Sequence, residues 1–90
     1  MLSFLSKTPS EMQQQIKDIM KQKRKALRLT QSELGHKSGV SLGSVKRFEQ
    51  SGKISFESLL QLAFVLECLD DFEKLCTSKN VIPKTLEDLK

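Results

Sequence analysis

The stretch that decides the fold runs Thr30-Gln31-Ser32-Glu33-Leu34-Gly35-His36-Lys37-Ser38-Gly39-Val40-Ser41-Leu42-Gly43-Ser44-Val45-Lys46-Arg47-Phe48-Glu49. Thr30 is a favourable helix N-cap, and Glu33 stands three residues later, where its side chain can reach back and complete a capping box. Leu34 follows as an apolar anchor, and Gly39 stands where a short helix should end in a left-handed residue. These signals predict a helix over residues 31–38.

A second helix, over residues 42–50, is predicted directly after this turn. Ser41 can cap it, and its apolar residues Val45 and Phe48 share a face because they are three positions apart. Gly35, inside the preceding helix, costs about 1 kcal/mol relative to Ala, which favours a close approach of two helices at that point. Two short helices joined by a glycine-containing turn form a helix-turn-helix, the unit that lays its second helix in the major groove of DNA.

Three further helices complete the expected fold. The run Thr8-Pro9-Ser10-Glu11 begins the first, over about 9–27, because it combines an N-cap, a proline at the first helical position and a capping glutamate. A fourth helix, over 56–66, is the most apolar part of the chain and should therefore lie centrally, and a fifth is expected over 70–77. The buried stripe of the first helix is expected to contain Met12, Ile16, Ile19, Met20, Lys23 and Leu27. The chain is thus predicted to be all-α, a compact bundle of five helices.

The two ends of the chain are expected to lie outside this bundle. Residues 1–8 form an N-terminal arm, which either pairs with a partner subunit or frays. Residues 78–90 form a C-terminal tail, extended or in a short helix, which is a docked arm, a dimer element or a disordered end. Between them, residues 9–77 are expected to form one domain.

The charge of the chain is divided unevenly along its length. Residues 1–54 carry 11 Lys and Arg against 4 Asp and Glu, a balance of +7, whereas residues 55–90 carry 4 against 7, a balance of −3. Lysine-rich helices are commonly just well solvated, so the asymmetry alone does not indicate a partner. Its coincidence with a helix-turn-helix favours a face that meets the phosphates of DNA.

Several function classes are excluded by composition. Ninety residues suffice for one modest core, and His36 with the dispersed Cys68 and Cys76 cannot supply a nucleophile, base and orienter, so an enzyme is not expected. The same three residues are too far apart in sequence to suggest a metal site, and no cofactor or small-molecule substrate is indicated. No run approaches the roughly 18 apolar residues that span a bilayer, and the opening residues lack the features of a signal peptide, so a cytoplasmic protein is expected.

Together these segments resemble the XRE family of bacterial and phage repressors. The resemblance extends over about residues 16–75 and implies a lambda-repressor-like fold, sequence-specific binding of double-stranded DNA and a place at the bacterial nucleoid. One small helix-turn-helix buries too little surface for tight specific binding, so a homodimer on a palindromic operator is also expected. The matching residues are Leu29-Thr30-Gln31, Glu33-Leu34, Gly39-Val40-Ser41, Ser44-Val45, Phe48-Glu49 and Leu59-Leu60-Gln61-Leu62-Ala63.

A narrower likeness concerns residues 40–55 and 70–73. The run from Val40 to Ser55, followed by Asp70-Asp71-Phe72-Glu73, is similar to HipB-type antitoxins that are paired with HipA-like kinase toxins. This likeness implies an antitoxin that represses its own HipBA-like (HipBST-like) operon. The alternatives are a stand-alone repressor of a phage or mobile element, and a toxin-neutralising interaction module with secondary DNA binding.

The XRE resemblance also implies roles for single residues. Gln31 matches a phosphate contact, Ser51 and Lys53 are candidate phosphate contacts in the following turn, and Arg47 is suited to bidentate recognition of guanine. Gly43 stands where a polar base-reading side chain is usual, so it either admits a close approach to the bases or leaves specificity to later residues and to DNA shape. The base and backbone contacts implied for the recognition helix and its cap are Ser41, Leu42, Gly43, Ser44, Lys46 and Arg47.

Two further sets are assigned to structure and assembly. Arg24 and Glu49 match a pair that forms an internal salt bridge in related repressors. Candidates for contact with a second subunit or another partner are apolar residues near the end of the chain. They are Leu66, Leu69, Phe72, Val81 and Ile82.

Overall fold

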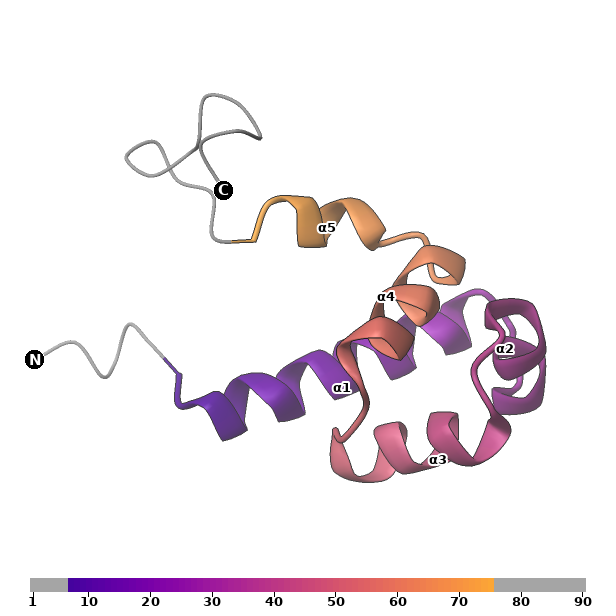
Figure 1. The fold of residues 1–90 in the computed structure, drawn as a ribbon, viewed down its shortest axis with the longest axis horizontal. Coiled ribbons are helices and arrows are strands. Elements are labelled where there is room, and N and C mark those ends of the chain that lie inside the picture. Colours follow the sequence, from indigo (N-terminus) through magenta and orange to yellow (C-terminus); the bar gives the residue numbers. More distant parts are fainter. Residues whose placement is uncertain (1–6, 76–90) are drawn as a thin grey trace, which may run out of the picture.

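The computed structural model describes residues 7–75, and within them every regular element is an α-helix. The elements are α1 (Pro9–Ala26), α2 (Gln31–Ser38), α3 (Leu42–Ser51), α4 (Phe56–Val65) and α5 (Leu69–Glu73). The predicted all-α fold is therefore confirmed. Helix α2 packs against both α3 and α4, α1 packs against α3, and α5 packs on α4. As a result α3 and α5 lie on opposite edges of the molecule, with α1 and α4 between them (Figure 1).

Helices α1 to α4 begin where the capping residues predicted. Thr8 and Thr30 each form a complete capping box with the glutamate three positions later, Glu11 and Glu33. In the second box, the Glu33 amide donates to Thr30 Oγ1 over 3.0 Å and the Thr30 amide donates to Glu33 Oε1 over 2.8 Å. These hydrogen bonds hold the pKa of the Glu33 carboxyl below its ordinary value. Local side-chain chemistry therefore fixes the helix starts.

The helix ends differ from the prediction at several places. Helix α3 includes Ser51, one residue beyond the predicted end, because the left-handed residue that terminates it is Gly52, at φ 82°. Helix α4 stops at Val65, and Glu67 in the following link also has a positive φ, of 64°. Helix α5 begins one residue early and ends at Glu73, so its predicted extension to residue 77 is wrong within the described residues.

The core lies where α1, α2, α3 and α4 meet. Leu34, Val45 and Leu62 are its largest fully buried side chains, which confirms Leu34 as the anchor of α2. Its other apolar members are Met20, Val40, Phe48, Ala63, Leu66 and Cys68. Each of these four helices contributes at least one buried residue to this single cluster.

Two predictions about apolar faces are wrong. Met12, Ile19 and Leu27 of the predicted stripe are exposed: Met12 and Ile19 line an open groove beside α5, and Leu27 lies beyond the end of α1. Helix α4 buries only one of its faces, through Leu62 and Ala63, whereas its Phe56 and Phe64 are 64% and 71% exposed. The spacing of apolar residues therefore overestimates how much of these helices is buried.

Candidate nucleic-acid interface

The turn between α2 and α3 is built by two glycines. Gly39 ends α2 at φ 78° and its amide donates to the carbonyl of Gly35 over 2.9 Å, as the left-handed cap predicted. A Cβ on Gly35 would lie only 2.7 Å from the carbonyl oxygen of Val40 and 3.5 Å from the amide of Leu42. The close approach expected at Gly35 is therefore present, and it is made by the turn and the start of α3.

The first turn of α3, Leu42 to Ser44, presents no charged side chain to the solvent. Ser41 caps it, accepting from the Ser44 amide over 3.1 Å and donating to the Ser44 hydroxyl over 2.9 Å. Leu42 is exposed, and a Cβ built on Gly43 would meet nothing within 4 Å. Since Gly43 has no positive φ and no close neighbour, nothing inside the described part of the protein requires a glycine there.

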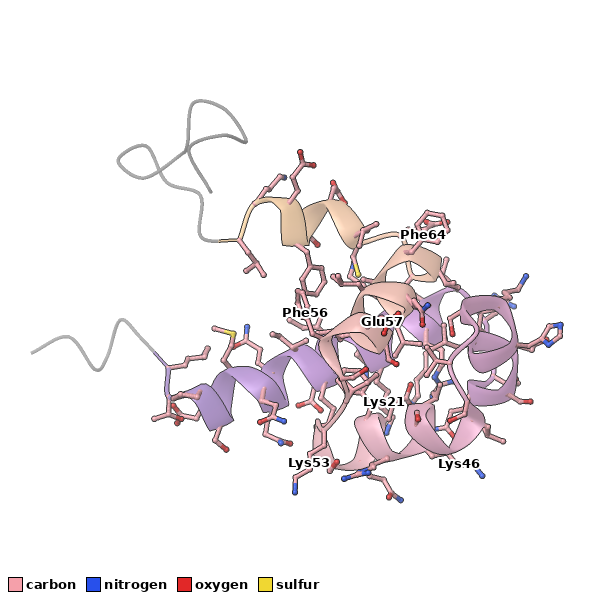
Figure 2. The ribbon with its side chains drawn as sticks, in the orientation of Figure 1. Lys21, Lys46, Lys53, Phe56, Glu57 and Phe64 are labelled. Atoms are coloured by element: carbon pink, nitrogen blue, oxygen red, sulfur yellow. The ribbon has the colours of Figure 1, made fainter. Side chains whose placement is uncertain are left out.

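The second turn of α3 carries the exposed cations. Lys46 and Arg47 are both exposed, whereas Val45 and Phe48 on the opposite face are buried. Lys46 and Lys53 flank α3 on one edge of the molecule, and Phe64 of α4 lies on the other (Figure 2). The basic side chains thus follow the exposed side of α3.

An open polar hollow of about 370 Å³ adjoins this edge. It brings together three of the predicted DNA-binding residues, Ser44, Arg47 and Lys53. Ser55 and Ser58 at the start of α4 also line it, and neither is among the predicted site residues. A serine before an apolar helix is the sequence signal of an N-cap, and Ser55 indeed caps α4: its hydroxyl accepts from the Ser58 amide over 3.1 Å. Two cations beside a helix N-terminus form a favourable environment for an anion such as a phosphate.

A buried ion pair joins α3 to α1. Arg24 Nε lies 2.8 Å from Glu49 Oε2, and Arg24 Nη2 lies 3.0 Å from Glu49 Oε1, so the expected salt bridge is present and bidentate. The two residues are only 8% and 6% exposed. Arg24 also donates from Nη1 to the carbonyl of Leu29 over 2.7 Å, which ties the link before α2 to the same pair.

Gln31 takes part in this buried network. Its Nε2 donates to Glu49 Oε1 over 2.9 Å, so the amide that was predicted to bind a phosphate also stabilises Glu49 within the protein. Burial acts to raise the pKa of Glu49, but the hydrogen bonds from Arg24 and Gln31, together with the charges of Arg24 and Lys21, outweigh it and hold this pKa below its ordinary value. Glu49 is therefore a carboxylate at neutral pH that joins its own helix, α3, to α1 and α2.

The C-terminal end of α3 is held by α1 in a way that the sequence did not indicate. Gln13 Nε2 donates to the carbonyl of Gly52 over 2.8 Å, and Gln14 Nε2 donates to the carbonyl of Ser51 over 2.9 Å. The Ser51 hydroxyl donates to the Arg47 carbonyl over 2.7 Å and accepts from the Lys53 amide over 3.1 Å. Ser51, predicted to contact phosphate, therefore already uses its hydroxyl to close the end of the helix.

The residues predicted for contact with a partner fall into separate environments. Leu66 is 3% exposed and belongs to the core, so its assignment to an intermolecular contact is wrong: it fills the space beneath α4. Leu69 is exposed, and Phe72 is half-buried against the core. Val81 and Ile82 lie outside the described residues, as does Cys76.

Other kinds of site are not found in residues 7–75. No three His, Cys, Asp or Glu side chains of this part of the chain are grouped so that they could hold a metal ion. None of its helices has both the length and the apolar character needed to cross a membrane. His36 on α2 is exposed, and Cys68 is a buried free thiol whose pKa is raised by burial.

Comparison with known proteins agrees with this geometry. The family model described as Helix-turn-helix matches residues 20–68, which extend from the buried end of α1 to the link before α5 and contain the whole surface described above. No curated protein and no solved structure matches the chain. The family is one of DNA-binding regulators and is not an enzyme class. The chain belongs to the XRE-type helix-turn-helix family.

Proposed function

We propose that this protein is a sequence-specific transcriptional repressor that binds a palindromic operator as a homodimer, with α3 in the major groove. The observation that carries the proposal is the division of α3 into two faces. Val45, Phe48 and Glu49 are buried, and Glu49 is held by Arg24, so the position of the helix is fixed by the protein itself. The opposite face is exposed and basic.

The residues of the exposed face are suited to two kinds of contact with DNA, one with the bases and one with the phosphates. Leu42 is suited to contact with a thymine methyl group, and Lys46 can donate to base edges in the major groove. Lys53 and the start of α4 line the polar hollow, where they are suited to a phosphate. Arg47 belongs to both regions, since it lies on α3 and lines the hollow. Bare backbone at Gly43 supports a close approach of α3 to the bases.

A second subunit is expected because one domain alone makes too small an interface with DNA. One helix-turn-helix buries too little surface, whereas two related by a two-fold axis meet half-sites about 34 Å apart. Met12 and Ile19 of α1, together with Leu75 just after α5, are exposed apolar residues that continue from Phe72 along an apolar groove and supply a contact surface. We place the dimer contact there, with Val81 and Ile82 of the tail as further candidates.

The likeness of residues 40–55 and 70–73 to HipB-type antitoxins supports a second role for the same protein. In this role it neutralises a HipA-like kinase and represses the operon that encodes both proteins, in the cytoplasm at the nucleoid. The neighbouring reading frame distinguishes the alternatives: a kinase-like gene favours the antitoxin, and an integrase or an opposing repressor gene favours a phage-type switch.

The test is a fluorescence anisotropy titration of the protein with DNA from upstream of its gene and with a scrambled duplex. We expect preference for the upstream sequence and a steep loss of affinity as salt rises. Lys46→Ala should weaken binding, whereas Lys37→Ala, which removes an exposed cation of α2 beside α4, should not. Equal affinity for both duplexes would overturn the proposal.

A further inference from the structure

Helix α4 exposes an aromatic stripe that the DNA-binding function does not use. Phe56, Leu60 and Phe64 are four residues apart and therefore lie along one face of the helix. Phe56 and Phe64 are the two most exposed large apolar side chains of the described residues, and Figure 2 shows both projecting from α4. An exposed apolar patch of this kind on a small protein commonly marks a binding surface.

Helix α5 turns this stripe into a groove. Leu69 and Phe72 form the facing wall, and the open space between the two helices has a volume of about 720 Å³. We call this space the α4–α5 groove and define it by Phe56, Leu60, Phe64, Leu69 and Phe72. A shallow apolar groove between two helices has the shape that accepts the apolar side of a third helix.

The charged residues at the edge of the α4–α5 groove are all acidic. Glu67, Asp70 and Glu73 line it, and no Lys or Arg does so. Within residues 7–75, none of these three carboxylates makes a hydrogen bond or salt bridge. The neighbouring hollow against α2, which shares Phe64 with the groove, is lined by one lysine, Lys37, and one glutamate, Glu57. The rim therefore has a negative charge although the chain as a whole has a net charge of +4.

This charge distinguishes between two occupants. A second copy of the chain, related by a two-fold axis through the groove, would bring two acidic rims together with no cation lining either of them. The apolar groove between α1 and α5 has no such conflict, because its charged lining residues are one lysine, Lys23, and one aspartate, Asp71. We infer that the α4–α5 groove binds another protein through an amphipathic helix whose apolar stripe is flanked by Lys or Arg.

The position of the groove allows this binding together with DNA binding. Phe64 lies on the edge of the molecule opposite Lys46 and Lys53 (Figure 2). A partner seated between α4 and α5 therefore leaves the exposed face of α3 accessible. The inference rests on the groove and its charges alone, and it holds for a kinase toxin or for any other partner with this chemistry.

The experiment uses the full chain and two labelled synthetic peptides of one length and one apolar pattern. Both have Leu and Phe at helical spacing of three and four, with Lys and Arg at the remaining positions in one peptide and Glu in the other. We expect the basic peptide to bind at least tenfold more tightly, although the net charge of the protein would favour the acidic peptide. Phe64→Ser should weaken the basic peptide at least tenfold, and Asp70→Asn with Glu73→Lys should remove most of its advantage.

The matched control is Leu27→Ser, which removes an exposed apolar side chain just after α1, outside both the α4–α5 groove and the α1–α5 groove, and should leave peptide binding unchanged. Light scattering of the same variants tests the other occupant: a Phe64→Ser protein that is monomeric, where the parent protein and Leu27→Ser are dimers, would overturn the inference. Equal binding of both peptides, or no effect of Phe64→Ser, would do the same. The operator titration run in parallel reports on DNA binding separately, so a failure there leaves the groove unaffected.

Discussion

Gly43→Ala is expected to make the protein more stable and a weaker DNA binder. Gly43 lies in the first turn of α3 with no positive φ, and a Cβ there meets nothing within 4 Å. Alanine at a helical position that tolerates it typically adds about 0.4–1 kcal/mol of stability, because the unfolded chain loses conformational freedom. For a domain of this size, that gain corresponds to a rise in Tm of roughly 2–8 °C.

The loss of DNA affinity follows from the same open space. In the proposed complex, the base edges of the operator occupy the space beside Gly43, so the added methyl group holds α3 away from them. Loss of one good base contact amounts to about 1–3 kcal/mol, or roughly a 5- to 150-fold rise in Kd. Thermal unfolding followed by circular dichroism gives the first quantity and operator anisotropy the second.

The other glycines provide controls for Gly43. Gly35→Ala places a Cβ 2.7 Å from a backbone carbonyl, and Gly52→Ala strains a residue at φ 82°, so both should lower Tm. If Gly43→Ala raises Tm and leaves operator affinity unchanged or improved, Gly43 does not face the bases and the proposed docking of α3 is wrong. If it lowers Tm, the reading of Gly43 as free of internal constraints is wrong.

Three further predictions concern other parts of the molecule. Because the pKa of Glu49 is lowered in the folded protein, the stabilising effect of its ionised carboxylate is complete above about pH 4.5, the ordinary pKa of a glutamate, and is lost as the pH falls through the lowered folded value. Glu49→Gln should lower the free energy of unfolding by about 3 kcal/mol at pH 7. In urea titrations at several pH values, the variant should also lose less stability than the parent protein as the pH falls. Arg47→Lys should relax preference for one guanine by about 1–3 kcal/mol, whereas Lys53→Ala should weaken all duplexes alike and reduce the salt slope by about 1; an unchanged base preference would assign Arg47 to the phosphates. Leu66→Ala should lower the free energy of unfolding by about 2–5 kcal/mol through the cavity it leaves, and Leu69→Ala by much less, since Leu69 is exposed. If both variants lost the same stability in thermal melts, the assignment of Leu66 to the core and of Leu69 to the surface would be wrong.

The parts of the fold that the sequence predicted correctly are those decided by neighbouring residues. Both capping boxes join residues three positions apart, and the end of α2 depends on one glycine. Such features are local, so they can be recognised without knowing what packs on the helix. The same holds for the exposed positions of α3, which follow from the burial of Val45 and Phe48 on the other face.

The features that the sequence did not predict depend on contacts between distant segments. Gln13 and Gln14 are separated from the end of α3 by more than thirty residues, at sequence distances of 39 and 37 from their acceptors. No local pattern marks a glutamine that will hold another helix. Apolar spacing likewise shows which residues of α4 share a face but not whether another helix covers it, which is why the exposure of Phe64 was missed.

The separation of the two faces of α3 has a consequence for protein engineering. The residues that hold this helix in place, Val45, Phe48 and Glu49, are distinct from the exposed residues Leu42, Gly43, Lys46 and Arg47. Because the exposed positions make little contribution to the core, they can be exchanged as a set without rebuilding the domain. The domain is therefore a suitable scaffold for a library randomised at these four positions, from which variants that recognise new operators can be selected.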